Sequence, residues 1–363
     1  MERSEWDGAL RELGGHLLQS WGWGEYKRGQ GWRVERLRAA GPAGAAMAQV
    51  LFRHRGPVSL AYVPRGPALG GDPAAAFAAL VPALDAACRR HRAVSLLLEP
   101  DAGSPLAGPG PWAGFRPTPR HFQPPRTVKV PLASDEALLG QMHTKTRQYV
   151  RLAQRRGYAV ERVTPDQAAL AAFYGLLEDT ARRNAFAIHP PAYYAGLAAA
   201  LGEDLALFFV RDESRLMAGQ MVPAFGVEAI SLHGASSTEH RAQGSAEYLD
   251  FEAMRWARGR GCTHYDLWGI PNVDPPPEDR GASRGTDQRG IFWYKTRFGG
   301  EIVSYPAGLE RRYRPVLASL VDQAVSMAGG GQGVVGQLAT RLRSRSRDVG
   351  LDGSPTRSTT TDS

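Results

Sequence analysis

Apolar and polar residues alternate along the first half of the chain in an order that predicts a strand pair, a helix and a buried strand. Residues 45–54 and 58–66 are short, mostly apolar runs typical of paired strands. Residues 72–91 carry an apolar face at helical spacing. Residues 93–100, AVSLLLEP, form a continuous apolar run, which favours a strand buried on both faces.

The second half repeats this order. Strands are predicted at 204–213, 216–226 and 228–237, followed by a helix at 245–261 and a strand at 264–270. Because the two patterns lie about 170 residues apart, we expect two domains of one α/β (α+β) type, over residues 1–150 and 151–325. Residues 326–363 lack apolar periodicity and are rich in Ser, Thr, Arg and Gly, so a disordered tail is expected there.

Charge and cysteine content narrow the classes of function. The formal net charge of +8 indicates a polyanionic partner such as nucleic acid, a nucleotide-linked substrate or an anionic lipid surface. An arginine-rich composition with a basic tail explains the same charge equally well. The only two cysteines, Cys88 and Cys262, have no paired spacing, so neither a disulfide framework nor a metal site is expected. Residues 1–20 lack the order of a signal peptide and no apolar run is long enough for a membrane span, so we expect a cytoplasmic protein.

One helix, predicted over residues 135–157, gathers cations along one side. It opens with acidic residues and closes on a glycine. The cations are Lys145, Arg147, Arg151, Arg155 and Arg156. Two interpretations remain open: a solvated face on a linking helix, or a ridge that contacts phosphates.

A short motif stands between a predicted strand and a predicted helix. Residues Arg241–Ala246, RAQGSA, match the R-x-x-G-x-A pattern with which acyl-CoA N-acyltransferases hold a pyrophosphate. Glycine allows the tight turn, and backbone N–H groups at a helix start attract anions. A plain helix-entry turn accounts for the same six residues.

Lysine is rare in this chain. Of its 44 basic residues only four are lysines, Lys27, Lys129, Lys145 and Lys295. Lys27 lies among aromatic residues and glycines in QSWGWGEYKRGQGW, where a compact ammonium suits a phosphate, although tryptophans packed on a core would give the same pattern. Lys295 lies in RGIFWYKTRFGGEIVSY, one turn before a Gly-Gly stop and a β-type run.

Taken in order, these segments resemble the FemABX aminoacyltransferases, which add bridge amino acids to peptidoglycan precursors. The resemblance extends from about Leu17 to about Tyr313. The segments that carry it are 19–32, 60–67 (LAYVPRGP), 96–100 (LLLEP), 122–132 (FQPPRTVKVPL), 145–157, 178–186 (EDTARRNAF), 233–270 and 290–302 (GIFWYKTRFGGEI). Their order and spacing together, rather than any one of them, indicate the family.

The resemblance implies two tandem acetyltransferase-like (GNAT-like) domains, in line with the duplicated pattern. It implies aminoacyl-tRNA as the donor, used as a co-substrate without a cofactor, and the side-chain amine of a muropeptide stem peptide as the acceptor. The acceptor is lipid-linked (lipid II) or UDP-linked (UDP-MurNAc-pentapeptide) in different members, and a lipid-linked one implies transient contact with the inner membrane face. No long polar heptad stretch occurs, so the chain resembles the members that have no helical arm.

The resemblance also implies roles for individual residues. Transfer from a tRNA ester to an amine passes through a tetrahedral oxyanion and then expels a ribose oxygen. Lys295, next to the substrate-binding Tyr294, is expected to stabilise that oxyanion and to donate a proton to the leaving oxygen, for which arginine is poorly suited. Lys27 is expected to bind the diphosphate of the acceptor, and Arg183 and Tyr248 to line the acceptor cleft.

Glu99, at the end of a predicted buried strand, is expected to face the acceptor amine and to deprotonate or orient it. The alternative is a strand-end carboxylate that caps a neighbouring turn. His233 and Asp266 also lie on predicted strands near the expected cleft, where lone polar residues are more often structural than catalytic.

Two other functions remain open at this point. An acyl-CoA-dependent N-acyltransferase of the same broad fold is favoured by residues 241–246 and disfavoured by the duplication and by the segment around Lys295. A non-catalytic RNA-binding protein would use the basic helix at 145–156 and would bind RNA whether or not it is charged with an amino acid.

Overall fold

The computed structural model describes residues 1–107, 112, 114–184, 187–239, 244–272 and 288–327. The chain divides into two units, Met1–Arg314 and the segment that begins at Pro315. The described part of the second unit is one helix, α10 (Pro315–Met327). It includes residues 326 and 327 of the predicted tail, and the rest of that tail lies outside the described residues.

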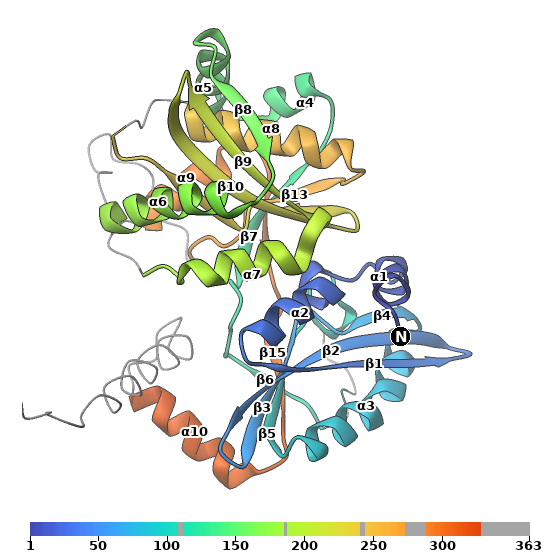
Figure 1. Cartoon of the computed structure of the whole chain (residues 1–363). Helices are drawn as coiled ribbons and strands as arrows, with labels where there is room; N and C mark the ends of the chain where they lie inside the picture. Colours follow the sequence, from blue (N-terminus) through green and yellow to red (C-terminus); the bar gives the residue numbers. More distant parts are fainter. Residues whose placement is uncertain (108–111, 113, 185–186, 240–243, 273–287, 328–363) are drawn as a thin grey trace, which may run out of the picture. The chain divides into compact units, whose positions relative to one another are not determined.

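The first unit contains two mixed β-sheets (Figure 1). In the described residues the first sheet has seven strands, in the order β1-β2-β3-β5-β15-β6 with β4 paired to β2. Its strands are β1 (Arg33–Gly41), β2 (Gly44–Arg55), β3 (Val58–Pro64), β4 (Ala68–Gly71), β5 (Ala93–Glu99), β6 (Arg116–Thr118) and β15 (Gly308–Arg312).

The second sheet has eight strands in the described residues, in the order β14-β7-β13-β11-β10-β9-β8 with β12 paired to β10. Its strands are β7 (Arg126–Pro131), β8 (Ala159–Val163), β9 (Leu205–Asp212), β10 (Arg215–Phe225), β11 (Glu228–Ile230), β12 (His233–Ser236), β13 (His264–Asp266) and β14 (Glu301–Ser304).

Helices connect and cover these strands (Figure 1). The α-helices of the first unit are α1 (Arg3–Glu12), α2 (Trp21–Gly29), α3 (Pro73–Arg90), α4 (Asp135–Gln141), α5 (Thr144–Arg155), α6 (Gln167–Asn184), α7 (Pro191–Leu201), α8 (Ser245–Gly259) and α9 (Gln288–Thr296). The described residues also form the short 3-10 helices η1 (Leu17–Gln19), η2 (Pro105–Ala107) and η3 (Gly202–Asp204). The predicted strand–helix–strand order of both halves is confirmed, with α3 and α8 as the two helices.

The two sheets have the same strand order, but each contains one strand that comes from the other half of the chain. Apart from β8, the orders β1-β2-β3-β5-β15-β6 and β9-β10-β11-β13-β7-β14 match position by position. Among the described residues each has one parallel contact, β3 with β5 and β11 with β13. β7 follows the first half in sequence but pairs with β13 in the second sheet, whereas β15, near the end of the unit, pairs with β5 in the first. The domain limits 1–150 and 151–325 stay a prediction. β7 and β15 lie across these limits, each in the sheet of the other half of the chain.

The second sheet lies between two hydrophobic cores. Along β9, Ala206 and Phe208 face a core shared with α5 and α8, while Leu207 and Phe209 face a core shared with α1, α2, α6 and α7. This alternation follows from the two-residue period of a strand. The latter core also includes Met47 of β2, so it joins the two sheets. A third core fills the space between the first sheet and α3.

The helix predicted over 135–157 is two helices, so that prediction was wrong. Ser134 caps α4, and His143 caps α5 by accepting a hydrogen bond from the Lys145 N–H at 3.2 Å. Between them Met142 is extended, and the His143 N–H donates to the Arg297 carbonyl at 2.8 Å. This contact with the end of α9 comes from residues distant in sequence, so local pattern does not reveal it.

No helix in the described residues has the length and apolar content that a bilayer span requires.

Candidate active site

Lys295 lies on α9 with its ammonium held by two backbone carbonyls. Its Nζ donates to the carbonyl of Gly269 at 2.8 Å and to that of Trp268 at 3.2 Å. Burial lowers the pKa of Lys295 to about 8, while Asp266 and Asp250 act in the opposite direction. The group is therefore mostly charged at neutral pH but releases its proton more readily than an ordinary lysine.

The turn that presents these carbonyls is fixed by Asp266 at the end of β13. Trp268 has a φ of 62°, in the left-handed region that a tryptophan rarely adopts. The Trp268 N–H donates to Asp266 Oδ1 at 2.7 Å. The hydroxyls of Thr127 and Tyr305 also donate to this buried carboxylate, the latter at 3.3 Å. Asp266 therefore has a structural role in this turn, as the sequence suggested for a lone polar residue here.

Tyr294 points to a second buried carboxylate, Asp250 of α8. Its hydroxyl donates to Asp250 Oδ2 at 2.6 Å. Gln220 Nε2 and the Tyr265 hydroxyl donate to Oδ1 of the same residue, at 2.7 and 3.1 Å. Burial raises the pKa of Asp250, although these hydrogen bonds oppose the rise. The Tyr294 hydroxyl is thus committed to Asp250, and its role in binding substrate stays a prediction.

Glu99 is only 2% exposed at the end of β5. Its carboxylate accepts hydrogen bonds from the Tyr62 hydroxyl and from the Phe122 N–H, and one from the Gln123 N–H at 3.3 Å. Burial raises its pKa, and the Tyr62 hydroxyl is the strongest opposing cause. These are the contacts of a carboxylate that caps a turn. Action on the acceptor amine stays a prediction.

Two residues join the surroundings of Glu99 to the turn that holds Lys295. The Arg65 guanidinium lies 3.2 Å from the centre of the Tyr305 ring, and its Nη2 donates to the Pro124 carbonyl at 2.7 Å. Tyr305 in turn donates to Asp266. Gly269 completes the link, since a Cβ added there would lie 2.7 Å from Pro124. The ends of β5 and β13 therefore form one connected structure.

Lys27 of α2 lies beside an aromatic cluster. Its Nζ is 4.7 Å from the Trp23 ring centre and 5.0 Å from that of Tyr26. Burial lowers the pKa of Lys27 to about 8, with a smaller contribution from Arg53. The adjacent Tyr193 packs edge-on against Tyr26. Lys27 is thus a charged group on an aromatic surface, a setting that also suits cation–π contact without any phosphate.

Arg183 is fixed on the surface of β12. Its guanidinium donates to the Ser236 hydroxyl at 2.9 Å, to the Ser236 carbonyl at 3.1 Å and to the Thr238 hydroxyl at 2.8 Å. His233, at the other end of this short strand, packs against the rings of Tyr193 and Tyr194. Burial, with smaller contributions from the charges of His189 and Lys27, lowers the pKa of His233 to about 3. Arg183 and Lys27 therefore lie near opposite ends of β12.

Tyr248 lies on α8 and is partly buried against the core beneath Tyr294. Its N–H donates to the Gly244 carbonyl at 2.9 Å, and burial, followed by Glu252, raises its pKa. Gly244 has a φ of 89° and starts α8. Arg241, Ala242 and Gln243 of the RAQGSA motif lie outside the described residues.

The structure thus brings Tyr294, Lys295 and Tyr248 together on α8 and α9. Contacts of Arg65 and Tyr305 connect this group to the surroundings of Glu99. Sequence reasoning missed Asp250, Arg65 and Tyr305. Asp250 had a signal in the sequence, because it is an acid between the apolar residues of the α8 face. In the structure it is 4% exposed. Arg65 and Tyr305 had none, since their partners are distant in sequence.

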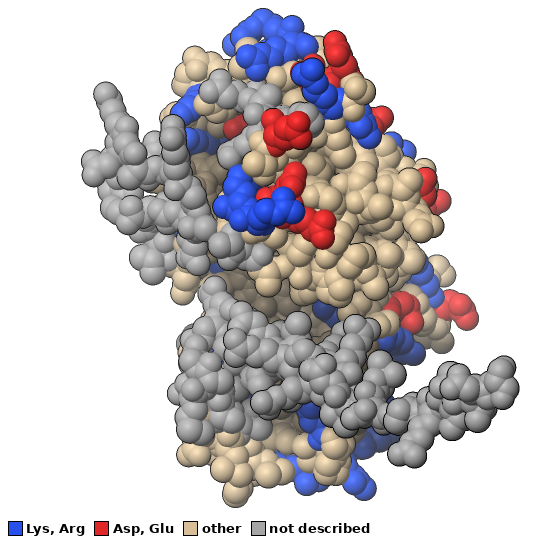
Figure 2. Space-filling model, turned by 60° about the vertical axis from the view of Figure 1, so that its left-hand side comes forward, with Lys and Arg blue, Asp and Glu red and all other residues tan. Residues whose placement is uncertain are grey.

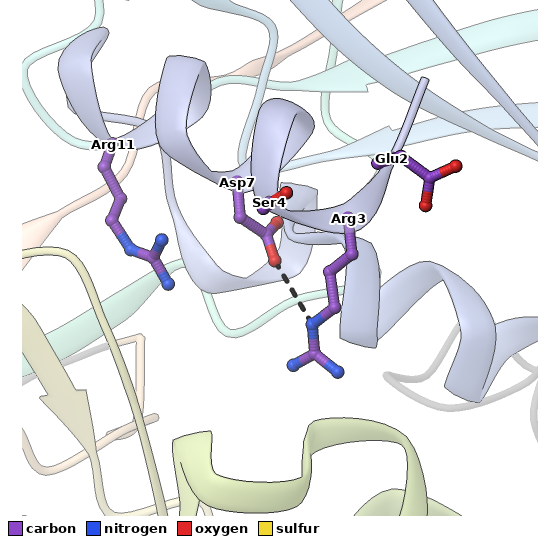
Figure 3. Close-up of a pocket in the computed structure, with 5 residues that line it drawn as sticks. All are labelled: Glu2, Arg3, Ser4, Asp7 and Arg11. Atoms are coloured by element: carbon purple, nitrogen blue, oxygen red, sulfur yellow. Dashed lines mark ion pairs between the residues drawn. The ribbon is translucent and has the colours of Figure 1, made fainter.

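Two surface hollows lie elsewhere, and none of the six predicted site residues lines them. One, of about 360 Å³, runs along α1 and is lined by Glu2, Arg3, Ser4, Asp7 and Arg11 (Figure 3). Its charged groups serve the fold, because Arg3 pairs with Asp204 at 2.9 Å and Asp7 accepts from the Trp21 N–H at 2.7 Å.

The other hollow, of about 390 Å³, is lined by the 14–17 and 101–103 segments and by residues of the second sheet. It contains the ion pair of Lys129 with Glu228 at 2.6 Å. Burial, followed by Asp266, raises the pKa of Glu228 to about 7. This pair joins β7 to β11 within the second sheet.

Comparisons with known proteins agree with this architecture. A family described as "Acetyltransferase (GNAT) domain" matches residues 141–275. The chain is similar to "Lipid II:glycine glycyltransferase" of Staphylococcus aureus, at 24% identity over 369 aligned positions that cover 78% of this chain and 85% of that protein.

Solved structures show the same fold. The crystal structure of FemX superposes with a TM-score of 0.74 at 22% identity, covering 88% of this chain and 98% of that one. The structure of L-PGS from Bacillus licheniformis gives a TM-score of 0.54 at 15% identity, covering 89% and 96%. The chain therefore has a tandem acetyltransferase-like α/β fold, and the resemblance to the FemABX family that its sequence indicated is confirmed.

Proposed function

We propose that the protein is an aminoacyltransferase that moves an amino acid from aminoacyl-tRNA to the side-chain amine of the stem peptide of a peptidoglycan precursor, and so builds an interpeptide bridge. The observation that carries the proposal is the Lys295 ammonium, held by the carbonyls of Trp268 and Gly269. The similarity to a protein named "Lipid II:glycine glycyltransferase" supports the substrate class.

The geometry suits the stabilisation of an oxyanion. An ammonium has three N–H donors, and two of those of Lys295 are used by the turn, which leaves one with a fixed direction. As the acceptor amine attacks the ester carbon, a C–N bond forms and the carbonyl oxygen becomes an oxyanion, to which this third N–H donates. Being fixed beforehand, the donor needs no reorganisation during the reaction.

The lowered pKa suits the second half of the reaction. As the oxyanion collapses to a carbonyl and the bond from carbon to the ribose oxygen breaks, the third N–H of Lys295 passes from the carbonyl oxygen to the ribose oxygen and gives it its proton. The proton that the attacking amine loses then restores the Lys295 ammonium, so the step balances. A lysine with a pKa of about 8 is a stronger acid than an ordinary lysine and still carries its proton at neutral pH. The ester is activated already, so no covalent enzyme intermediate is required.

Binding of the acceptor is assigned to the residues around β12 and α8. Lys27 supplies a positive charge for the diphosphate of the precursor, with Arg183, Tyr248 and Tyr294 lining the cleft. The diphosphate occurs in both lipid-linked and UDP-linked precursors, so Lys27 serves either. A lipid-linked acceptor requires transient contact with the inner membrane face.

The test is transfer of a labelled amino acid from a pool of charged tRNAs to a UDP-linked muropeptide and to its lipid-linked form. Wild type is compared with Lys295→Met and with Arg116→Met, which removes an exposed cation on β6 as a control. Product from wild type and the control, reduced about a hundredfold in Lys295→Met, is expected from the loss of one oxyanion donor. No product with either acceptor, together with a melting temperature raised by acetyl-CoA but not by charged tRNA, would contradict the proposal.

A further inference from the structure

The outward face of α5 carries cations that no acid on the helix balances. Its sequence, TKTRQYVRLAQR, contains no Asp or Glu. Lys145, Arg151 and Arg155 are exposed, and no ion pair of theirs occurs within the described residues. Arg147 donates to the Leu139 carbonyl at 3.4 Å.

On the neighbouring helix α8, the arginines are paired with acids. Arg255 and Arg258 of α8 both contact Asp135, at 3.0 and 2.8 Å, and Arg255 also contacts Glu252 at 2.8 Å. On α5, by contrast, residues 147, 151 and 155 follow one another at four-residue spacing. Each like-charged pair at this spacing costs about 0.2–0.5 kcal/mol of helix stability. A polyanionic partner would remove this repulsion.

The opposite face of α5 is its apolar one. Thr146, Val150 and Ala153 are buried, and the helix packs on α8. The remaining apolar side chains, Tyr149 and Leu152, are partly buried. An amphipathic helix that inserts into a membrane surface does so through exposed apolar side chains, and α5 exposes none. Its surface chemistry therefore fits a hydrophilic polyanion better than a bilayer.

The start of α5 is attached to the helix that carries Lys295. The His143 N–H donates to the carbonyl of Arg297, two residues beyond Lys295. From Lys145 to Arg155 the row then extends for roughly 15 Å at the rise of an α-helix. Figure 2 shows Lys and Arg side chains gathered at the end of the molecule where Figure 1 draws α5.

We propose that Lys145, Arg151 and Arg155 form a docking surface for the phosphate backbone of an RNA. The inference rests on the proposed function for the identity of that RNA, the donor tRNA. A stem whose phosphates follow α5 from its far end would approach α9 with its aminoacylated end. Arginine suits this surface because its planar fork binds phosphate oxygens in pairs.

The experiment measures binding separately from catalysis. Fluorescence anisotropy follows the binding of uncharged bulk tRNA between 50 and 200 mM salt. It compares wild type, the triple variant Lys145→Gln/Arg151→Gln/Arg155→Gln, and a control of equal charge, Arg33→Gln/Arg55→Gln/Arg116→Gln. The control residues are exposed and lie on β1, β2 and β6 of the first sheet.

Wild type and the control are expected to lose affinity steeply with salt. In the α5 variant the dependence of log K on log salt should become shallower, with a slope smaller in magnitude by about 2–3. The reason is that each of the three phosphate contacts contributes roughly 0.7–0.9 to that magnitude. Between 50 and 200 mM salt, the α5 variant should therefore lose about 20- to 40-fold less affinity than wild type. Removing the repulsion should leave the melting temperature unchanged or raised, so loss of folding is not expected.

Two outcomes would overturn the inference. One is an α5 variant with the same slope as wild type. The other is a wild type that binds vesicles of anionic phospholipid through these residues and does not bind tRNA. The first outcome would leave the proposed function intact, because transfer to the muropeptide is measured independently. The second would also count against tRNA as the donor. Conversely, RNA binding through α5 without any transfer would support the docking surface and contradict the enzyme.

Discussion

Replacing Lys295 by methionine separates the catalytic role of this lysine from its structural one. Methionine nearly matches the length of the apolar stem but has no N–H donor. The variant loses the third donor that we assign to the oxyanion, so the transfer rate should fall by about a hundredfold, which corresponds to about 3 kcal/mol of transition-state stabilisation.

The stability of Lys295→Met is subject to two opposing effects. The lowering of the pKa from 10.5 to about 8 means that the charged lysine costs the fold about 3 kcal/mol at neutral pH. Methionine removes this cost but leaves the carbonyls of Trp268 and Gly269 without a donor, at about 1–3 kcal/mol each. The two effects oppose one another, so urea unfolding at pH 7 should place the variant within a few kcal/mol of wild type.

The pH dependence tests the lowered pKa directly. Between pH 8 and 10.5 the unfolded chain keeps the proton on Lys295 whereas the folded chain has lost it, so this residue makes the free energy of unfolding rise with pH there. Activity changes in the opposite sense, because the proton donor is lost above pH 8. Lys295→Arg keeps its charge at all these values, so the ratio of wild-type to Lys295→Arg rate cancels titration of the acceptor amine and should fall about tenfold per pH unit above 8.

A rate that is unchanged in Lys295→Met, in a protein shown to be folded, would refute the assignment of the donor. A flat ratio between pH 7 and 10 would refute the loss of the Lys295 proton near pH 8 as a step that controls the rate. Both are measured with saturating charged tRNA in transfer assays that sample initial rates.

Three further changes address the surroundings of this site. Gly269→Ala places a Cβ 2.7 Å from Pro124, so the turn must shift, and we expect transfer to fall at least tenfold with about 1–3 kcal/mol lost in urea unfolding; a normal rate would contradict it. Tyr294→Phe removes a 2.6 Å hydrogen bond to Asp250 and should lower the free energy of unfolding by about 1–3 kcal/mol at pH 7, and by less at acidic pH where the carboxyl is protonated. Lys27→Met should raise the KM for the muropeptide roughly 10- to 100-fold with kcat little changed, as expected for loss of one charge-assisted contact; a fall in kcat alone would count against a binding role.

The sequence was informative where structure depends on neighbouring residues. Apolar runs predicted β2, β3, β5, β9 and β10, and helical periodicity predicted α3 and α8, because side-chain period is a local property of strands and helices. The duplication followed from the order of these elements. The rarity of lysine among the basic residues was enough to single out Lys27 and Lys295 as candidates for a role in the site.

The tertiary structure decided what depends on residues far apart in the chain. Nothing local to residues 126–131 indicates that β7 pairs with β13, and nothing local to β15 indicates that it pairs with β5. The backbone N–H and C=O groups of a strand edge pair with whichever strand the folded chain brings beside them. The same holds for Lys295. The sequence showed a lysine among aromatic residues, whereas its ammonium is positioned by two carbonyls in a turn 26 and 27 residues away, which a buried aspartate holds in a left-handed conformation. Periodicity sets which side of an element is buried, but the fixed direction of a charged group depends on hydrogen bonds that only the folded chain assembles.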